Sequence, residues 1–339
     1  MPRTIRNEYY KKLNYENLMK AHLESRKGKG LRKEIILFNM KQEEYIMWLY
    51  EQLRNKNYKH GGYTEFYVTE PKLRRIEKSK YIDRIVHRWY VDNFMIEYFT
   101  KSFCYNSYAC IKNKGMHKAC LDVQKAMKHC KKICENYYII KMDVSKYFQN
   151  IDKKILYEIL SRKIKDEDLL WLTREIVYSN GTEKGLPIGN YTSQCFANIY
   201  LNEMDQYVKH KLKIKYWYRY MDDMVTIVKN KKEAIEKLEK IRKFLRKELK
   251  LELNSKTQIF KGKQGVNFCG YKINEYRLKI RDKGKRKLKK KVLYLTGQVK
   301  LGKMSSKEAQ KYLTGHLGYI KIANVHTLTN KLFYSDTNE

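Results

Sequence analysis

Apolar and polar positions along this chain follow two periods, one typical of helices and one typical of strands. The helical period is clearest in residues 231–249, which we expect to form an amphipathic helix packed against a sheet. One face of that helix collects the apolar residues Ile235, Leu238, Ile241, Leu245 and Leu249. Apolar and aromatic runs at 138–142, 216–220 and 224–228 are instead typical of short buried strands.

The same patterns divide most of the chain into helices and strands in an irregular order. Helices are expected within 1–60, over 81–101 and 116–135, in the stretch that ends near 178, after the glycine-containing loop 181–190, and from 281 onward. Residues 61–80 include one strand-like run, and 251–280 alternate apolar and polar positions around glycines, as short strands do. This order indicates an α+β fold in which helices back an antiparallel sheet.

The chain is strongly basic, and its charge narrows the classes of partner. Lysine and arginine number 73 against 37 aspartates and glutamates, which gives a net charge of +36 over 339 residues. Such a field attracts polyanions, so a nucleic-acid partner is favoured. The alternative explanation is an AT-rich genome that favours lysine codons, which would also account for the 30 tyrosines and three prolines.

Cysteine usage and hydropathy argue against several other classes. The seven cysteines form no CxxC pair, so reduced thiols fit better than a disulfide scaffold or a zinc site. No apolar run approaches the ~20 residues that a membrane helix needs, and the N-terminal residues lack the apolar core of a signal peptide. We therefore expect a cytoplasmic protein without a membrane partner.

Two adjacent aspartates interrupt the apolar run that extends from Tyr216 to Val228. Asp222 and Asp223 fall where a hairpin would turn, so both carboxylates reach the sheet edge while the flanking strands stay buried. Two carboxylates this close repel each other unless a cation lies between them. All-oxygen ligation favours Mg²⁺, or Mn²⁺, over zinc.

A third aspartate ends another strand. Asp143 follows the apolar run 138–142, and the three carboxylates meet if the two strands are neighbours. That geometry suits two-metal phosphoryl transfer, in which one ion activates a hydroxyl nucleophile and the other stabilises the leaving phosphate. A plain turn explains an isolated Asp-Asp pair, but it does not explain this pair together with Asp143 and the basic charge.

Several motifs, in chain order, resemble those of the reverse transcriptases. The tetrapeptide YMDD at 220–223 resembles the YxDD hairpin of that family, and DVSKYF at 143–148 resembles its first metal motif. The segment 72–91 resembles the fingers, where the family pattern R-x-I falls on Arg74 and Ile76 and where Ser79 replaces the usual proline. Three further segments match the next fingers motif, the motif that places a lysine near the incoming phosphates, and the primer-grip turn: 106–119, 251–257 and 266–271. The resemblance covers about residues 60–320.

This resemblance implies a right-hand polymerase and a role for each matching residue. It assigns catalysis and metal binding to the three aspartates, with Val144 as a further metal ligand. It implies a nucleotide site of Lys72, Arg74, Tyr147, Phe148, Ile188, Gly189, Gln194 and Lys256, and a primer grip of Phe268, Cys269 and Gly270. Lys72 and Arg74 suit a triphosphate, because guanidinium and ammonium groups bind phosphate oxygens. The Phe148 ring would crowd a ribose 2′-OH and select deoxynucleotides, and core packing is its alternative role.

One segment departs from most members of the family and narrows the expected function. Most reverse transcriptases carry Q-G-x-x-x-S-P, whereas residues 188–194 of this chain are IGNYTSQ. An apolar first position and a final glutamine resemble the reverse transcriptases of diversity-generating retroelements, which copy a template RNA with errors at adenines to diversify a target gene. Ile188 in place of glutamine removes a donor and an acceptor, and a pocket with fewer placed polar groups discriminates less.

The resemblance also implies a domain order and partners. We expect a helical N-terminal extension at 1–60, part of the fingers at 61–135, the palm with an inserted fingers segment at 136–277, and a small helical thumb at 278–339. The basic stretch from Arg281 is expected along the template–primer backbone, with a merely solvated helix edge as the alternative. The implied partners are dNTPs, template RNA with its cDNA primer, and a small basic accessory protein that forms a multimer.

Other functions remain open at this point. One alternative is an antiphage-defence enzyme or another bacterial reverse transcriptase, although the IGNYTSQ segment argues against retrons. Another is a non-catalytic RNA-binding protein with a polymerase fold, against which the presence of all three aspartates argues. The ring at Phe148 and the YMDD context disfavour an RNA-dependent RNA polymerase.

Overall fold

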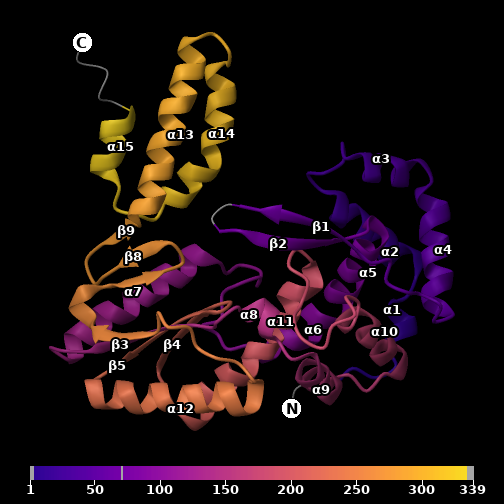
Figure 1. Ribbon diagram of the computed structural model, residues 1–339, viewed down its shortest axis with the longest axis horizontal. Helices are drawn as coiled ribbons and strands as arrows, with labels where there is room; N and C mark the ends of the chain where they lie inside the picture. The colour runs from indigo at the N-terminus through magenta and orange to yellow at the C-terminus, as the bar shows by residue number, and fades with distance from the viewer. Residues whose placement is uncertain (1–3, 70–71, 334–339) are drawn as a thin grey trace. The chain divides into compact units, whose positions relative to one another are not determined.

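The computed structural model describes residues 4–69 and 72–333, which form two compact units (Figure 1). The first unit comprises Met1–Tyr105, Val144–Leu212 and Lys240–Asn254, and the second comprises Asn106–Asp143, Lys213–Glu239 and Ser255–Glu339. The chain therefore passes from one unit to the other several times. Helices and antiparallel strands are both present, which confirms the α+β class. The expected domain boundaries near residues 60, 135 and 277 stay a prediction.

The first unit consists mainly of helices. They are α1 (Tyr9–Lys12), α2 (Tyr15–Arg26), α3 (Lys33–Met40), α4 (Gln42–Arg54), α5 (Tyr81–Tyr90), α6 (Ile96–Phe99), α8 (Tyr147–Asn150), α9 (Lys153–Lys163), α10 (Glu167–Val177) and α11 (Tyr191–Gln206). Three helix starts follow from local sequence, because the side chains of Asn14, Asp152 and Asp166 accept hydrogen bonds from backbone N–H groups of the first turn.

A two-stranded antiparallel ribbon belongs to the same unit. It consists of β1 (Tyr63–Val68) and β2 (Arg74–Ser79), paired from Tyr63 opposite Ser79 to Val68 opposite Arg74. Only β1 was expected as a strand from its apolar pattern. The apolar pattern does not predict β2 because its sequence is mostly polar. Most of the ribbon is exposed to solvent, so it needs no apolar face.

The second unit is built on a four-stranded sheet with the order β4-β5-β3-β6. These strands are β3 (Tyr138–Asp143), β4 (Tyr216–Tyr220), β5 (Asp223–Val228) and β6 (Gln258–Lys261), and all neighbours are antiparallel. Helix α7 (Met116–Ile133) packs against this sheet, and its buried side chains share one core cluster with Ile139, Val225 and Ile227. The strands expected at 138–142, 216–220 and 224–228 are therefore confirmed, and the sheet is antiparallel as predicted.

A smaller sheet and three helices complete the second unit. The sheet has the order β7-β8-β9, formed by Val266–Phe268, Tyr271–Ile273 and Leu278–Ile280. Its apolar side chains join the α7 core cluster. The helices are α13 (Asp282–Lys300), α14 (Ser306–Ile320) and α15 (His326–Phe333), and a capping box between Ser305 and Glu308 starts α14.

Helix α12 (Lys231–Leu249) has residues in both units, and it corrects one expectation. Leu238, Ile241, Leu245 and Leu249 are buried as predicted, but Ile235 is 48% exposed. Ala234, which is fully buried, occupies the core stripe instead. It lies four residues before Leu238 and seven before Ile241, so it is in line with both, whereas Ile235 is turned by about 100° to the edge of that stripe.

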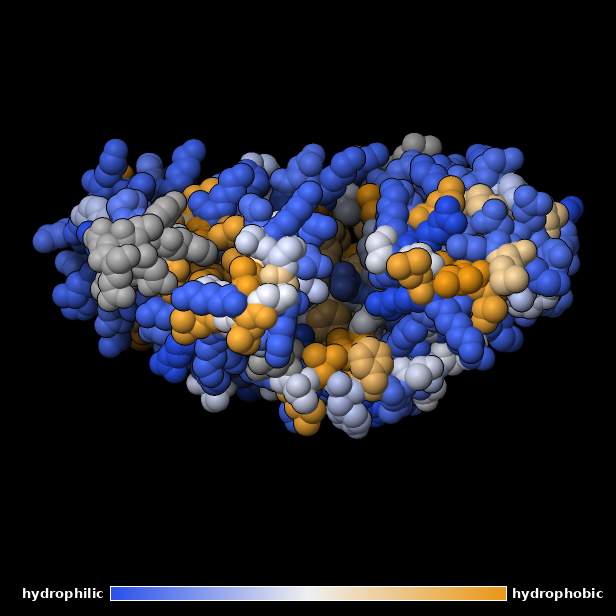
Figure 2. Space-filling view, turned by 90° about the horizontal axis from the view of Figure 1, so that it is seen from above, coloured by the Kyte–Doolittle hydropathy of each residue, from blue (hydrophilic) through white to orange (hydrophobic). Residues whose placement is uncertain are grey.

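Hydrophilic residues predominate on the face drawn in Figure 2, and apolar residues form smaller patches there. Within residues 4–69 and 72–333, none of the helices combines the length and apolar character that crossing a membrane requires.

Candidate active site

The strand register of the second unit brings two of the three aspartates together. Asp143, the last residue of β3, lies directly opposite Asp223, the first residue of β5. Asp222 precedes Asp223 in the turn between β4 and β5. Side chains two residues apart share one face of a strand, so Asp143 lies on the same face as Ile139. The register thus pairs Asp143 with Asp223, and the expected meeting of all three carboxylates around a cation stays a prediction.

The turn that carries Asp222 is tight and locally strained. Tyr220 pairs with Asp223, which leaves Met221 and Asp222 as the only residues between the strands. Met221 has a φ of 57°, in the left-handed region that residues with a side chain seldom adopt. The fully buried Arg219 supports this turn, because its guanidinium donates a hydrogen bond to the Met221 carbonyl oxygen at 3.2 Å.

A lysine lies beside these carboxylates. Lys141 is two residues before Asp143 on β3, and its ammonium group forms an ion pair with the carboxylate of Asp223. The same ammonium lies 5.5 Å from the ring centroid of Phe268. Burial lowers the pKa of Lys141 to about 8, although the nearby Asp143 and Asp222 carboxylates oppose that shift.

The carboxylates fit a divalent cation that the substrate helps to bind. Among the described residues, no three His, Cys, Asp or Glu side chains converge closely enough to enclose a metal ion by themselves. Mg²⁺ in nucleotide-transfer sites is usually held by one or two carboxylates, and substrate phosphates and water complete its shell. Asp143 opposite Asp223, with Asp222 adjacent, offers the oxygen donors that such a site needs.

Two further predicted elements lie in the second unit. Lys256 is exposed in the turn before β6, and β6 pairs with β3 so that Gln258 lies opposite Lys141. The antiparallel direction places this turn at the end of the sheet where Asp143 lies. The predicted primer-grip turn joins β7 to β8 through Cys269 and Gly270, both with positive φ, of 47° and 88°. A Cβ on Gly270 would lie 2.5 Å from the Tyr319 hydroxyl oxygen, so glycine is required there.

In the first unit, three segments meet around Ile188. The Phe148 carbonyl accepts a hydrogen bond from Leu186 N–H at 2.7 Å, and the Ile188 carbonyl accepts one from Glu77 N–H at 3.0 Å. A Cβ on Gly189 would lie 3.0 Å from Cγ2 of Ile76, and Gly189 has a φ of +120°. The loop thus lies along β2, which also carries Arg74.

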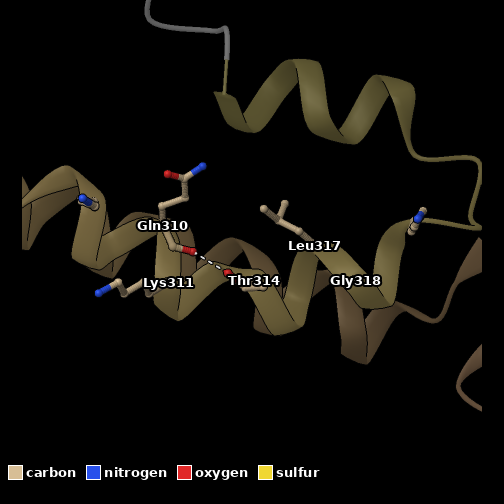
Figure 3. A pocket seen from close by; sticks show the side chains of 7 residues that line it. Gln310, Lys311, Thr314, Leu317 and Gly318 are labelled. Atoms are coloured by element: carbon tan, nitrogen blue, oxygen red, sulfur yellow. Dashed lines mark hydrogen bonds between the residues drawn. The ribbon is translucent and has the colours of Figure 1, made fainter.

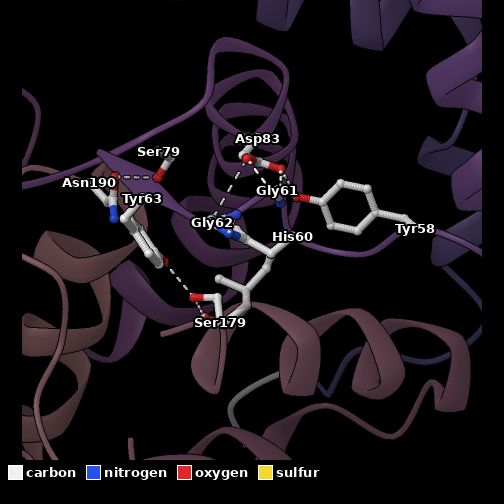
Figure 4. Close-up of polar contacts among 10 residues, drawn as sticks. Tyr58, His60, Gly61, Gly62, Tyr63, Ser79, Asp83, Ser179 and Asn190 are labelled. Carbon is white, nitrogen blue, oxygen red and sulfur yellow. Dashed lines mark hydrogen bonds and ion pairs between the residues drawn. The ribbon is translucent and has the colours of Figure 1, made fainter. Parts of the chain in front are cut away.

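A side-chain hydrogen bond fixes this loop to the ribbon. The Ser79 hydroxyl donates to Oδ1 of Asn190 at 2.6 Å, and both residues are buried (Figure 4). Asn190 precedes α11, but its side chain does not cap that helix, and its Nδ2 has no hydrogen-bond partner among the described residues. The serine that replaces the family's usual proline therefore makes a contact that proline could not make.

Comparison with known proteins assigns the chain to a family. The sequence model of the family described as reverse transcriptase (RNA-dependent DNA polymerase) matches residues 68–273. The chain belongs to the reverse transcriptase family. The matched range contains all three aspartates, the Ile188 loop and the primer-grip turn.

Individual relatives of this reverse transcriptase are distant. Protein YkfC of Escherichia coli K12 is 28% identical over 60% of this chain and 63% of its own length. A COX1/OXI3 intron 2 protein of Saccharomyces cerevisiae is 21% identical over 63% of this chain and 31% of its own length. The chain thus spans less than two thirds of either relative. A solved apo telomerase from Candida tropicalis, truncated from its C-terminal domain, is 15% identical over 65% of this chain and 55% of its own, with a TM-score of 0.47.

The remaining predicted site residues of this reverse transcriptase differ in accessibility. Lys72, Arg74 and Gln194 are exposed, so solvent and ligands can reach them. Tyr147 is 2% exposed and its hydroxyl donates to the Ala197 carbonyl at 2.5 Å, so its side chain is part of the core. Its role at the nucleotide site stays a prediction. Val144 is also buried, and because its side chain has no donor atom, only its backbone carbonyl could bind a metal.

A basic groove runs along α14 in the second unit (Figure 3). It measures about 610 Å³, and its lining residues are Lys307, Gln310, Lys311, Thr314, Leu317, Gly318 and Lys321. These positions recur every three or four residues, so they form one stripe of the helix.

Two of these features were not anticipated from the sequence. The Ser79–Asn190 contact joins residues 111 positions apart and carries no local signal. Lys141 does carry one, because its position two residues before Asp143 in an alternating strand places it on the same face.

Proposed function

We propose that this protein is an RNA-directed DNA polymerase that works through the Asp143, Asp222 and Asp223 carboxylates. The observation that carries the proposal is the register of β3 and β5, which sets Asp143 opposite Asp223 at the end of a shared sheet. Membership of the reverse transcriptase family supports this activity. The substrates follow from it, namely dNTPs and a DNA primer on a template RNA, and a basic chain of +36 suits such polyanions.

The residues divide the work of nucleotide addition. The three aspartates would hold two Mg²⁺ ions, which when bound lower the pKa of the primer 3′-hydroxyl and neutralise charge on the leaving pyrophosphate. Lys72, Arg74 and Lys256 are the cationic side chains proposed to bind the triphosphate. Phe148 excludes a ribose 2′-OH by its bulk, and the turn Phe268–Gly270 positions the primer.

Primer extension on a defined RNA template with Mg²⁺ tests the activity. Asp222→Asn keeps the shape of the side chain but removes its charge, so we expect extension to fall by at least about a hundredfold, since cation binding supplies several kcal/mol. Asp168→Asn removes a carboxylate that pairs with Lys56 in the first unit, and it should leave extension unchanged. Equal extension by wild type and Asp222→Asn would remove the catalytic assignment.

We further propose that the enzyme makes errors at template adenines and diversifies a target gene. Support comes from Ile188, which occupies the position of the pocket glutamine and lies on the loop that Glu77 binds through the backbone. An isoleucine side chain neither donates nor accepts hydrogen bonds, so it cannot sense the polar edge of a mismatched pair. The structured template RNA and a small basic accessory multimer are the partners this role requires, in the cytoplasm of a bacterium.

The error spectrum on a defined RNA tests this finer role. Ile188→Gln should lower misincorporation opposite adenine by about threefold to tenfold, the worth of one net hydrogen bond, with little change opposite other bases. Ile188→Met is the matched control, because methionine is similar in length to glutamine but has no amide group. This variant should keep the wild-type error spectrum. Unchanged adenine errors in Ile188→Gln would instead favour an antiphage or other bacterial reverse transcriptase.

A further inference from the structure

Lys141 occupies an unusual position for a lysine. It lies in the interior of β3, flanked by β5 on one side and β6 on the other, and its side chain is 19% exposed. Its neighbours in β3 include the fully buried apolar residues Ile139 and Met142. Burying an ammonium group costs free energy unless partners compensate for its lost hydration.

The partners that compensate are two elements of the proposed active site. On one side is the Asp223 carboxylate, one of the proposed metal ligands, with which Lys141 forms an ion pair. On the other side is the ring of Phe268, whose centroid is 5.5 Å from the ammonium nitrogen, within the range of a cation–π contact. Phe268 is 1% exposed and ends β7 at the primer-grip turn.

The register explains why this lysine reaches both partners. Asp143 pairs with Asp223 and Lys141 pairs with Val225, so Lys141 is the diagonal neighbour of Asp223 on the same face of the sheet. That face is the one against which α7 and the β7–β9 sheet form a common core. Asp143 and Asp222 also act on the ammonium through their charge.

We propose that Lys141 is the built-in counter-ion of the carboxylate cluster, which pairs with Asp223 when no divalent cation is bound and competes with the cation for that carboxylate. A positive charge in contact with one ligand opposes entry of a second positive charge, so Lys141 weakens metal affinity. Through Phe268 the same ammonium links the carboxylate cluster to the primer-grip turn. Lys141 is thus a positioning residue that makes metal binding conditional on the phosphates of an incoming nucleotide. This inference rests on the proposed metal site.

The test measures Mn²⁺ binding to the full chain by calorimetry, without nucleotide or nucleic acid. Lys141→Met keeps the length and apolar stem but removes the charge, and Lys141→Arg keeps the charge. We expect Lys141→Met to bind Mn²⁺ about tenfold more tightly than wild type, which corresponds to ~1.4 kcal/mol, and Lys141→Arg to resemble wild type. Asp143→Asn defines which part of the isotherm belongs to the cluster. Equal or weaker binding by Lys141→Met would overturn the proposal.

Thermal unfolding gives an independent readout. Without Mn²⁺, Lys141→Met should unfold at a lower temperature than wild type, because the Asp223 carboxylate loses its ion pair with Lys141. Saturating Mn²⁺ should remove most of that deficit. Lys125→Met, an exposed lysine of α7, is the control and should show neither effect. A deficit that Mn²⁺ does not change would contradict the counter-ion role. Lys141→Gln serves as the neutral variant if Lys141→Met does not fold.

These experiments distinguish failure of the proposed metal site from failure of the counter-ion role of Lys141. If wild type and Asp143→Asn bind Mn²⁺ identically, the proposed metal site itself fails. If Asp143→Asn loses a binding site but Lys141→Met gains no affinity, the metal site stands and only the counter-ion role fails.

Discussion

The hydrogen bond between Ser79 and Asn190 offers a quantitative test of how the nucleotide loop is held. Ser79→Ala leaves Oδ1 of Asn190 unbonded beside an Nδ2 that already has no hydrogen-bond partner among the described residues. Because Asn190 is buried, we expect the free energy of unfolding to fall by about 1–3 kcal/mol. Asn190→Ala removes the unpaired amide itself, and no helix cap is lost because the Asn190 side chain does not cap α11. The free energy of unfolding should therefore fall by less, about 1 kcal/mol.

A double-mutant cycle, measured by urea unfolding, isolates the contact. The double variant should be less destabilised than the sum of the single variants by about 0.5–3 kcal/mol. Ser161→Ala removes a hydroxyl that donates to the Glu158 carbonyl in its own helix, and it is the control for loss of a hydroxyl. Because Ser79 ends the strand that carries Arg74, KM for dNTPs should rise in both single variants more than kcat falls. Additive free energies would show that the two side chains do not hold the loop together.

Three other perturbations have outcomes that the structure specifies. Gly189→Ala adds a methyl group 3.0 Å from Ile76 Cγ2 at a φ of +120°. It should raise KM for dNTPs several-fold in a steady-state assay and lower the free energy of unfolding by about 1–3 kcal/mol. Gly181→Ala, also at positive φ but with open space around it, is the control and should leave KM unchanged. Burial lowers the pKa of His87 from 6.5 to about 3, so between these pH values the imidazole is protonated in the unfolded state only. Between pH 7.5 and pH 5 the free energy of unfolding should therefore fall by about 2 kcal/mol more in wild type than in His87→Phe, as measured by denaturant unfolding. Equal losses in the two proteins would contradict this. Phe148→Ala should raise ribonucleotide incorporation, relative to deoxynucleotides, by at least about tenfold in a competition assay, and unchanged selectivity would assign the ring to the core.

Local sequence determined the elements that present the chemistry. Tyr216–Tyr220 and Asp223–Val228 are strands because their β-branched and aromatic residues suit a buried sheet, and the carboxylates between them can only lie at the turn. The position of Asp143 at a strand end follows from the same pattern. The IGNYTSQ segment is equally local, so the expected departure from the usual pocket glutamine needed no tertiary information.

Only the tertiary structure decided which of these elements are neighbours. Alternation along β3 defines two faces, but it does not say that β5 lies beside it in the register that sets Asp143 opposite Asp223 and brings Lys141 to Asp223. Packing likewise buried the Tyr147 side chain, and it turned Ile235 toward solvent against expectation. The pairing of Ser79 with Asn190, 111 residues apart, has no local cause. Short-range patterns set backbone preferences and faces, whereas partners across the fold are selected by the packing of the whole chain.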